Sequence, residues 1–437
     1  MYRYQILLTQ LLFLLLACEK STSIVEIPTK ISITYPEQIV ASNVTNDSVS
    51  YTNLSTGHTF TVSADTEVAL RVGLYQCSYC ADAIYWVGDT RKEGVLKATL
   101  ENVVITDDSY HLLFEPFLMI EKNDFIIEEI FFTGTLRNTG KQYYGDSYIK
   151  LFNNTDQVLY ADGLAFVESK FSSTDRYDYD PDIRKDTMTV QAIYVIPGSG
   201  NEHPVNPGES ILLCDTGIDH RAANSNSFDL TGADFEWYDI STSPAHMDID
   251  SELVPNLDKW YSYTLSFFVL HNRGFRSYAL ARIPMDRETY MANYVYTYTY
   301  EIVVPAGTFP KQQTAHKIPN EWIVDGVNCS VQAEWEWNLL PATLDAGWTH
   351  CGTINHDATR YFKSVRRKLL YLDEDGKRVL KDTDNSSDDF NAECVPSVIE
   401  LQHSAIRADG TKATQITYDG VIPVETVPNN DSSDKIQ

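Results

Sequence analysis

The stretch "GDSYIKLFNNTDQVLYADG", residues Gly145–Gly163, decides the fold. Side chains of opposite character alternate from Tyr148 to Phe152, which predicts a strand with one buried face and with Lys150 on a solvent face. Asn153 follows and can close an Asx turn, after which the alternation resumes. Because the two strands and their polar turn contain no catalytic residue, the stretch is predicted to be part of the structural scaffold.

The composition of the whole chain points to the same class of fold. The 437 residues suffice for two or three domains with cores of their own. Twenty-seven tyrosines and 18 phenylalanines suit many half-buried strands, and long amphipathic helical patterns are scarce. The sequence therefore predicts a mainly β protein with two β-sandwich, immunoglobulin-like domains in tandem. Its net charge of −27 disfavours a nucleic-acid partner.

The amino terminus predicts export. An apolar run from Ile6 to Leu16 is too short to span a bilayer, and it ends at Cys18 just before a polar segment. The residues "LLAC" (Leu15 to Cys18) resemble a bacterial lipobox, which implies that residues 1–17 are a signal peptide and that Cys18 is lipidated. We therefore expect a lipid-anchored protein of the outer membrane, facing the periplasm or the cell surface.

A polar tether, residues 18–30, precedes a first predicted domain over residues 31–120. Short β patterns such as "ISITYP" (Ile31 to Pro36) and "EVALRVGLYQC" (Glu67 to Cys77) are separated by turn residues, which is typical of a small sandwich. This region resembles the transthyretin-like or carboxypeptidase-regulatory-like modules. The resemblance implies a spacer or adhesion module without chemistry of its own.

The second predicted domain covers residues 125–397. "IIEEIFFTG" (Ile126 to Gly134), "GDSYIKLFNNTD" and "NPGESILLC" (Asn206 to Cys214) resemble consecutive strands of the lamin-tail domain, an immunoglobulin-like sandwich. "NRGFRSYALARI", "WIVDGVNCS" and "KSVRRK" followed by "DTDNSSDDF" resemble its later strands. Together with the lipobox, the pattern resembles a family of Bacteroidota lipoproteins of unknown function, DUF4876. That family implies an architecture and an outer-membrane location, with no assigned activity.

Two segments, residues 167–205 and 215–272, are predicted to be insertions between the strands of this sandwich. Long insertions in a sandwich are where recognition residues usually lie. The first contains "DRYDYDPD", whose aromatic and acidic side chains are candidate partner-binding residues: Tyr177, Asp178, Tyr179, Asp180 and Asp182.

Six cysteines follow Cys18. Cys77 and Cys80 form a C-x-x-C and are the candidates for a disulfide in an exported protein. A redox couple or a half zinc site is the alternative, but no second C-x-x-C exists and the surrounding pattern is that of a strand.

No metal site is expected, although one motif comes close. Asp382, Asp384, Asp388 and Glu393 fall at ligand positions of an EF-hand-like loop, but Ser387 stands where the loop needs glycine. The histidines near residues 246 and 350–356 match no zinc spacing. No cofactor is expected.

Two functions remain open. The first is a non-enzymatic binding or accessory module that meets a protein, a glycan or an outer-membrane transporter. The alternative is a metal-dependent hydrolase that uses Asp and His residues of the insertions. The carboxyl end is predicted to form a strand extension over residues 398–425 and a disordered tail over 426–437.

Overall fold

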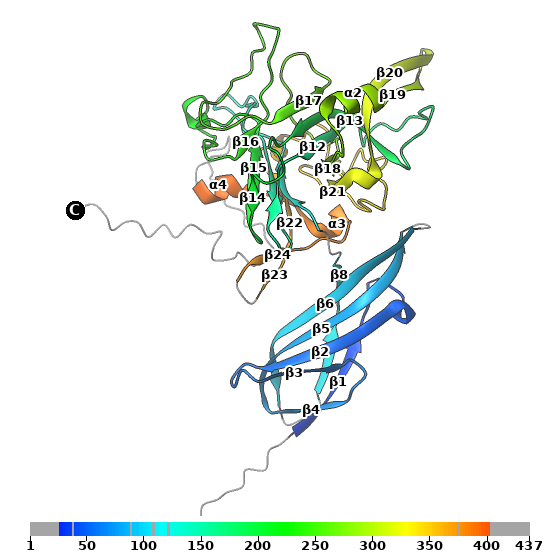
Figure 1. Cartoon of the computed structure of the whole chain (residues 1–437), viewed down its shortest axis with the longest axis vertical. Helices are drawn as coiled ribbons and strands as arrows, with labels where there is room; N and C mark the ends of the chain where they lie inside the picture. Colours follow the sequence, from blue (N-terminus) through cyan, green and yellow to red (C-terminus); the bar gives the residue numbers. More distant parts are fainter. Residues whose placement is uncertain are drawn as a thin grey trace, which may run out of the picture. The chain divides into compact units, whose positions relative to one another are not determined.

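The computed structural model describes residues 26–36, 39–87, 90–106, 110–119, 123–373 and 376–402. These residues form two compact units, one from the chain up to residue 118 without the segment 86–90, and one from residue 119 onward together with 86–90. Strands are the main regular elements of both units (Figure 1). The predicted signal peptide, Cys18 and the predicted tail 426–437 lie outside the described residues. No helix among those described is long and apolar enough to cross a membrane.

The N-terminal unit is a sandwich of two sheets. One sheet has the order β4 (Val68–Arg71), β1 (Glu26–Ile33) and β7 (Tyr110–Phe114). The other has the order β3 (Thr59–Ser63), β2 (Val44–Asn53), β5 (Gly73–Val87), β6 (Thr90–Ile105) and β8 (Phe117–Met119). Residues of β5 alternate between buried and exposed, so Cys77 and Tyr79 are buried. β1 begins at Glu26, inside the segment predicted as a tether, because Ile27 and Thr29 already pack inward.

The larger unit is a second, bigger sandwich. Its first sheet has the order β16 (Phe235–Glu236), β15 (Ser210–Cys214), β10 (Tyr148–Phe152), β9 (Ile126–Phe131), β22 (Ser364–Arg367) and β25 (Phe390–Cys394). The second has the order β19 (Val295–Val304), β20 (Gly307–Pro319), β13 (Thr187–Val195), β12 (Leu164–Ser169), β18 (Tyr278–Arg282) and β21 (Ile323–Val327), with β17 (Asp258–Ser262) also paired to β13. Ile149 of the first sheet shares one core with Phe166 and Leu280 of the second. The predicted class, mainly β with tandem sandwiches, is confirmed.

Short elements complete the larger unit. Two small ladders pair β11 (Leu159–Tyr160) with β14 (Pro204–Val205) and β23 (Leu369–Leu372) with β24 (Arg378–Leu380). The described helices are α2 (Arg287–Asn293), α3 (Ser386–Asp389) and α4 (Ser397–Gln402), with 3-10 turns at Ala41–Asn43, His220–Ala222, Asn320–Trp322 and Ala358–Arg360.

Strand β10 forms where the sequence predicts it, but its outer face is not in solvent. Tyr148 and Phe152 are fully buried, because Phe228 and α4 cover one end of this face and Leu369 and Leu380 cover the other. Lys150 is half-buried, and its Nζ lies 3.2 Å from a carboxylate oxygen of Glu128. The prediction of a solvent face is therefore wrong.

Local turns agree with their residues. The side-chain oxygen of Asn153 accepts a hydrogen bond from the backbone N–H of Thr155, at 3.0 Å, which closes the predicted Asx turn. Gly208 has a φ of +81°, so the turn before β15 takes the left-handed backbone that glycine permits.

Both predicted insertions contribute strands to the sandwich. Segment 167–205 contains β13, a central strand of the second sheet, and segment 215–272 contains β16 and β17. β13 is buried along almost its whole length, which is why its sequence lacks the alternation of a one-sided strand.

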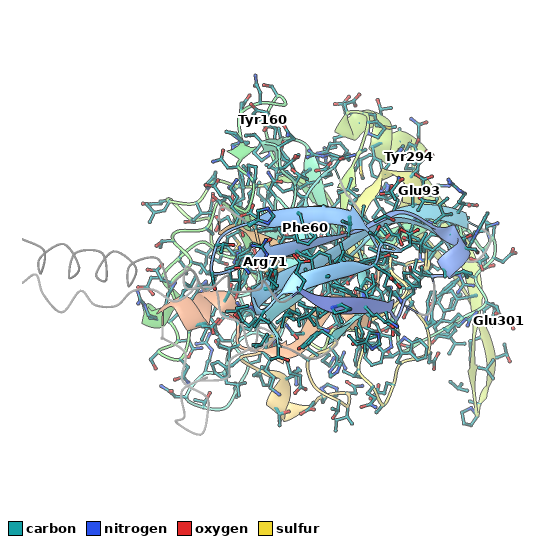
Figure 2. The ribbon with its side chains drawn as sticks, turned by 90° about the horizontal axis from the view of Figure 1, so that it is seen from below. Phe60, Arg71, Glu93, Tyr160, Tyr294 and Glu301 are labelled. Carbon is teal, nitrogen blue, oxygen red and sulfur yellow. The ribbon has the colours of Figure 1, made fainter. Side chains whose placement is uncertain are left out.

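Two elements differ from expectation at the ends of the larger unit. The hairpin of β19 and β20 was not predicted, and it extends away from the rest of the unit with Glu301 near its outer part (Figures 1 and 2). Residues 397–402 form α4, where the sequence predicted a strand extension from residue 398, and the rest of that extension lies outside the described residues.

Candidate functional site

A polar pocket of about 290 Å³ lies in the larger unit. Three loops build it: one leaves β12, one precedes β18 and one follows β21. Its lining is mostly polar: Ser172, Thr174, Asp175, His271, Arg273, Phe275, Arg276, Glu334 and Asn355. Loops that meet at one end of a rigid sandwich hold such side chains in fixed positions.

Two arginines give the pocket its donors. Nη1 of Arg276 donates to the carbonyl of Lys170 at 2.6 Å, while the buried Nε of Arg276 has no hydrogen-bond partner among the described residues. Nη1 of Arg273 donates to Oδ1 of Asn355 at 2.7 Å, and the guanidinium lies 5.0 Å from the ring centre of Phe275. Each guanidinium is thus fixed through its Nη1 atom, and its other N–H groups remain for a ligand.

His271 is neutral and acts as a further donor. Its Nδ1 accepts a hydrogen bond from the backbone N–H of Phe275 at 3.2 Å, so the ring proton sits on Nε2. Burial, with the positive charges of Arg276 and Arg273, lowers the pKa of His271 to about 3. The imidazole therefore stays uncharged at neutral pH.

Carboxylates and hydroxyls supply acceptors in the same pocket. Oε1 of Glu334 accepts from the backbone N–H of Asn355 at 3.0 Å, and the hydroxyls of Ser172 and Thr174 lie 2.8 Å apart. Nε1 of Trp337 donates to the carbonyl of Ser172 at 3.0 Å and so fixes this loop. With Asp175, the lining contains two carboxylates and two guanidiniums.

A buried glutamate supports the pocket. Oε2 of Glu168 accepts from the backbone N–H of His271 at 3.1 Å, and Oε1 accepts from Gln191 at 2.5 Å. Burial raises the pKa of Glu168 to about 7, although Arg276 acts in the opposite direction. Glu168 thereby ties β12 to the loop that carries His271.

The predicted partner-binding residues lie beside this pocket in two different environments. Asp178, Asp180 and Asp182 are exposed, and Asp182 forms a bidentate pair with Arg184. Tyr177 is half-buried. Tyr179 is 7% exposed and stacks on Phe171 with ring centres 3.9 Å apart, so its ring belongs to a core and is not presented to a partner.

Cys77 and Cys80 do not form a disulfide. They are three positions apart on β5, so their side chains point to opposite faces, Cys77 buried and Cys80 exposed. The expected pairing is excluded by the strand itself.

The residues of the EF-hand-like motif have different contacts in the structure. Asp382 lies 3.0 Å from Arg367, and Glu393 lies 3.0 Å from Nζ of Lys363. Asp388 lies within α3 and accepts a hydrogen bond from Nδ2 of Asn385, the N-cap residue, at 3.1 Å. Asp384 joins no metal-capable group within the part of the chain that the structure describes.

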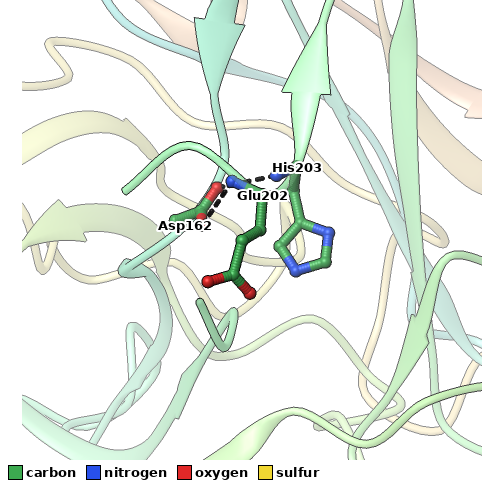
Figure 3. Close-up of side chains that lie close together, drawn as sticks. All are labelled: Asp162, Glu202 and His203. Atoms are coloured by element: carbon green, nitrogen blue, oxygen red, sulfur yellow. Dashed lines mark hydrogen bonds between the residues drawn. The ribbon is translucent and has the colours of Figure 1, made fainter. Parts of the chain in front are cut away.

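One group of metal-capable side chains does come together: Asp162, Glu202 and His203 (Figure 3). The Asp162 carboxylate accepts from the backbone N–H groups of Glu202 and His203, each at 2.9 Å, and from that of Gly200 at 3.1 Å. Burial opposes its ionisation, but these donors outweigh burial and hold the pKa of Asp162 at about 2. Gly198, at a φ of +128°, passes so close to Asp162 that a Cβ would collide with it. The arrangement is that of a carboxylate that fixes a loop.

Sequence reasoning missed both the pocket arginines and this loop anchor. Arg273 and Arg276 stand within a motif that was assigned to a strand, and Asp162 meets its partners some 40 residues along the chain. No local pattern signals either arrangement.

The fold and the pocket together define a tandem β-sandwich protein with a small polar pocket in its larger unit. Residues 206–397 match the model of a family described as "Protein of unknown function (DUF4876)", which confirms the family resemblance for this segment. No curated protein matches the chain.

Two solved structures are similar to the chain. A DUF4876 family protein from Bacteroides thetaiotaomicron VPI-5482 is 19% identical, with a TM-score of 0.52 over 85% of this chain and 96% of that one. This likeness supports the fold. A protein described as a "putative adhesin" from Bacteroides ovatus ATCC 8483 is 8% identical, with a TM-score of 0.16 over 68% of this chain and 83% of that one, and is too distant to inform the fold or the site.

Proposed function

We propose that this protein is a non-enzymatic binding module of the bacterial cell envelope, anchored to the outer membrane through a lipid on Cys18. The observation that carries the binding role is the pocket, in which three loops of one sandwich bring donors and acceptors together. Fixed polar groups in a concave site are the usual means by which a protein orients a small ligand.

The chemistry of the pocket favours binding over reaction. A general base needs a pKa near the working pH, whereas His271 has a pKa of about 3 and uses Nδ1 to accept from the backbone. Among the described residues the Ser172 hydroxyl is hydrogen-bonded to Thr174 and to no histidine or carboxylate that would activate it as a nucleophile. These groups are suited to hold a ligand in place.

A metal-dependent hydrolase is the competing function, and Asp162, Glu202 and His203 are its best candidates. Both oxygens of Asp162 already accept backbone hydrogen bonds, which reduces their capacity to bind a cation. Elemental analysis distinguishes the two functions. Stoichiometric zinc or manganese that is required for turnover would replace the binding proposal with the hydrolase.

The lamin-tail-like and transthyretin-like relationships support a spacer unit followed by a recognition unit. In this arrangement the larger unit meets a glycan, an outer-membrane transporter or another envelope protein. The net charge of −27 makes a nucleic-acid partner unfavourable.

The test compares wild type with Cys18→Ala in the native host. We expect the wild-type protein in the outer-membrane fraction and the variant in the soluble fraction, because the acyl chains provide the anchor. Crosslinking and pull-down from solubilised outer membranes should recover a stable partner or ligand with wild type. Equal membrane retention of both forms would contradict the anchor, and substrate turnover by the purified protein would contradict the binding role.

A further inference from the structure

We infer that the pocket recognises a carboxylate on a small ligand, with Arg276 as the residue that receives it. The inference rests on the proposed binding function and adds the chemical class of the ligand.

Other arginines of the larger unit show what this edge does when it is satisfied. Arg184, Arg221 and Arg282 each use Nε and Nη2 together to hold both oxygens of an aspartate, at 2.5–2.8 Å. The paired N–H groups of this edge match the two oxygens of a carboxylate, which is why bidentate pairs of this kind recur in proteins.

Arg276 keeps the same edge without an acceptor. Its only hydrogen bond within the described chain is from Nη1 to the Lys170 carbonyl, and Nε is buried without a partner. A buried guanidinium N–H with no acceptor is unfavourable, so a ligand that supplies one gains affinity. Arg276 also lines the pocket, so its guanidinium borders the space that a small ligand would occupy.

Neighbouring groups favour negative charge at this position. Arg273 lines the same pocket, and His271 presents its protonated Nε2 as a neutral donor. Arg276, Arg273 and Arg360 all disfavour a positive charge on His271, in addition to its burial, so these guanidiniums act on the same side of the pocket.

The remaining lining limits what else the ligand carries. Asp175 and Glu334 offset the two arginines, so the pocket suits one carboxylate together with hydroxyl or ammonium donors rather than a polyanion. A volume of about 290 Å³ accommodates a single small molecule. An acidic sugar and a free amino acid share this chemistry, and they are the two sources to compare.

The experiment is isothermal titration of the full mature lipoprotein in detergent with glucuronate, alanine and glucose. Glucose is the matched neutral control, because it has the ring and hydroxyls of glucuronate without the carboxylate. We expect at least one of the two carboxylate probes to bind saturably and at least tenfold more tightly than glucose. Which of them binds identifies the source.

Variants then test the residue. Arg276→Gln should lower the affinity for the bound probe at least tenfold. Arg221→Gln should leave this affinity unchanged, because the exposed pair of Arg221 with Asp219 lies outside the pocket. If Arg276→Gln unfolds, Arg273→Gln takes its place, with the same expectation. A thermal melt of each variant separates lost binding from lost structure.

Three results would overturn the inference: glucose binding as tightly as glucuronate, full affinity in the folded pocket variants, or saturable binding of neither carboxylate probe. The proposed function fails differently. Capture of an envelope partner together with any of these three results leaves the binding role standing without the carboxylate pocket, whereas catalytic turnover refutes the binding role itself.

Discussion

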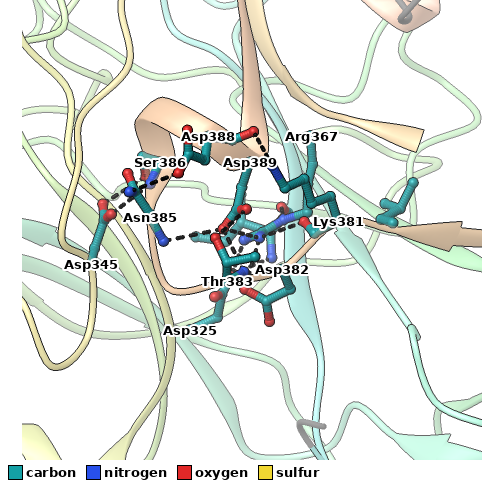
Figure 4. A network of polar contacts seen from close by, with 12 residues as sticks. Asp325, Asp345, Arg367, Lys381, Asp382, Thr383, Asn385, Ser386, Asp388 and Asp389 are labelled. Carbon is teal, nitrogen blue, oxygen red and sulfur yellow. Dashed lines mark hydrogen bonds and ion pairs between the residues drawn. The ribbon is translucent and has the colours of Figure 1, made fainter. Parts of the chain in front are cut away.

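Arg367 is the residue that ties the last strands of the chain to the core. Its guanidinium is buried and contacts Asp325 at 2.8 Å, Asp382 at 3.0 Å and Asp389 at 3.7 Å (Figure 4). It also donates to the carbonyl of Ile127 on β9 at 2.8 Å. Removing one member of a buried ionic network leaves its partners as uncompensated charges. The "KSVRRK" motif, which resembles a later strand of the lamin-tail domain, thus also carries the central cation of a buried ionic network.

We therefore predict that Arg367→Met lowers the free energy of unfolding by about 3–5 kcal/mol, because three buried carboxylates lose their counter-charge. Guanidinium denaturation followed by tryptophan fluorescence measures this. The exposed pair of Arg221 with Asp219 supplies the control, and Arg221→Gln should leave the midpoint unchanged. A small effect of Arg367→Met would mean that the carboxylates are neutral or hydrated in solution.

The hairpin of β19 and β20 is attached to the sandwich by an aromatic cluster. Tyr179 stacks on Phe171 and meets Tyr298 edge to face at 5.5 Å, while Trp337 lies 6.2 Å from Phe171. The loop that carries Tyr179 also pairs with β19, because the backbone N–H of Asp180 donates to Thr299 at 2.9 Å. The segment predicted to recognise a partner is therefore packed against the hairpin.

Tyr179→Ala should loosen the outer part of this hairpin, whereas the ladder of β20 with β13 keeps its base in the sheet. We expect a loss of about 3–5 kcal/mol from the emptied aromatic site and faster protease cleavage between residues 295 and 319. Limited proteolysis with mass spectrometry locates the cuts. The control is Asp178→Ala, at an exposed neighbouring residue, which the protease should cleave at the wild-type rate. Equal cleavage of the two variants would show that the aromatic cluster does not hold the hairpin.

At the scale of the whole molecule, buried acids set the response to pH. Burial raises the pKa of Glu168 and Asp345 to about 7, whereas an unfolded carboxyl titrates near 4. Between these values the folded protein binds more protons than the unfolded chain, so its stability falls as pH rises. Asp162 acts oppositely: with a pKa of about 2, its contribution is present above pH 4 and is lost below it.

We predict that the thermal midpoint is highest near pH 5 and that it falls both toward pH 8 and below pH 4. Differential scanning calorimetry across this range measures it. Glu168→Gln should reduce the fall between pH 5 and pH 8, because the amide has no proton to release. A midpoint that rises steadily from pH 5 to pH 8 would contradict the assignment of raised pKa values.

Local features were predictable because they depend on few neighbouring residues. The Asn153 turn, the glycine turn before β15 and the strand over Tyr148–Phe152 form where the sequence indicates. β13 was harder to predict, since a strand covered on both faces lacks alternation. The tether boundary was wrong because Glu26–Thr29 pair with β4, some 40 residues further along the chain.

The sequence by itself determined the fold class and the family resemblance, because composition, alternation and turn residues act over short distances along the chain. Only the tertiary structure decided which side chains share a site. It brought Arg276 beside Asp175 and Glu334, placed Tyr179 in a core, and turned Cys77 and Cys80 to opposite faces. The physical reason is that pockets and networks of buried charges form between segments that are remote in sequence. No local sequence pattern indicates such contacts.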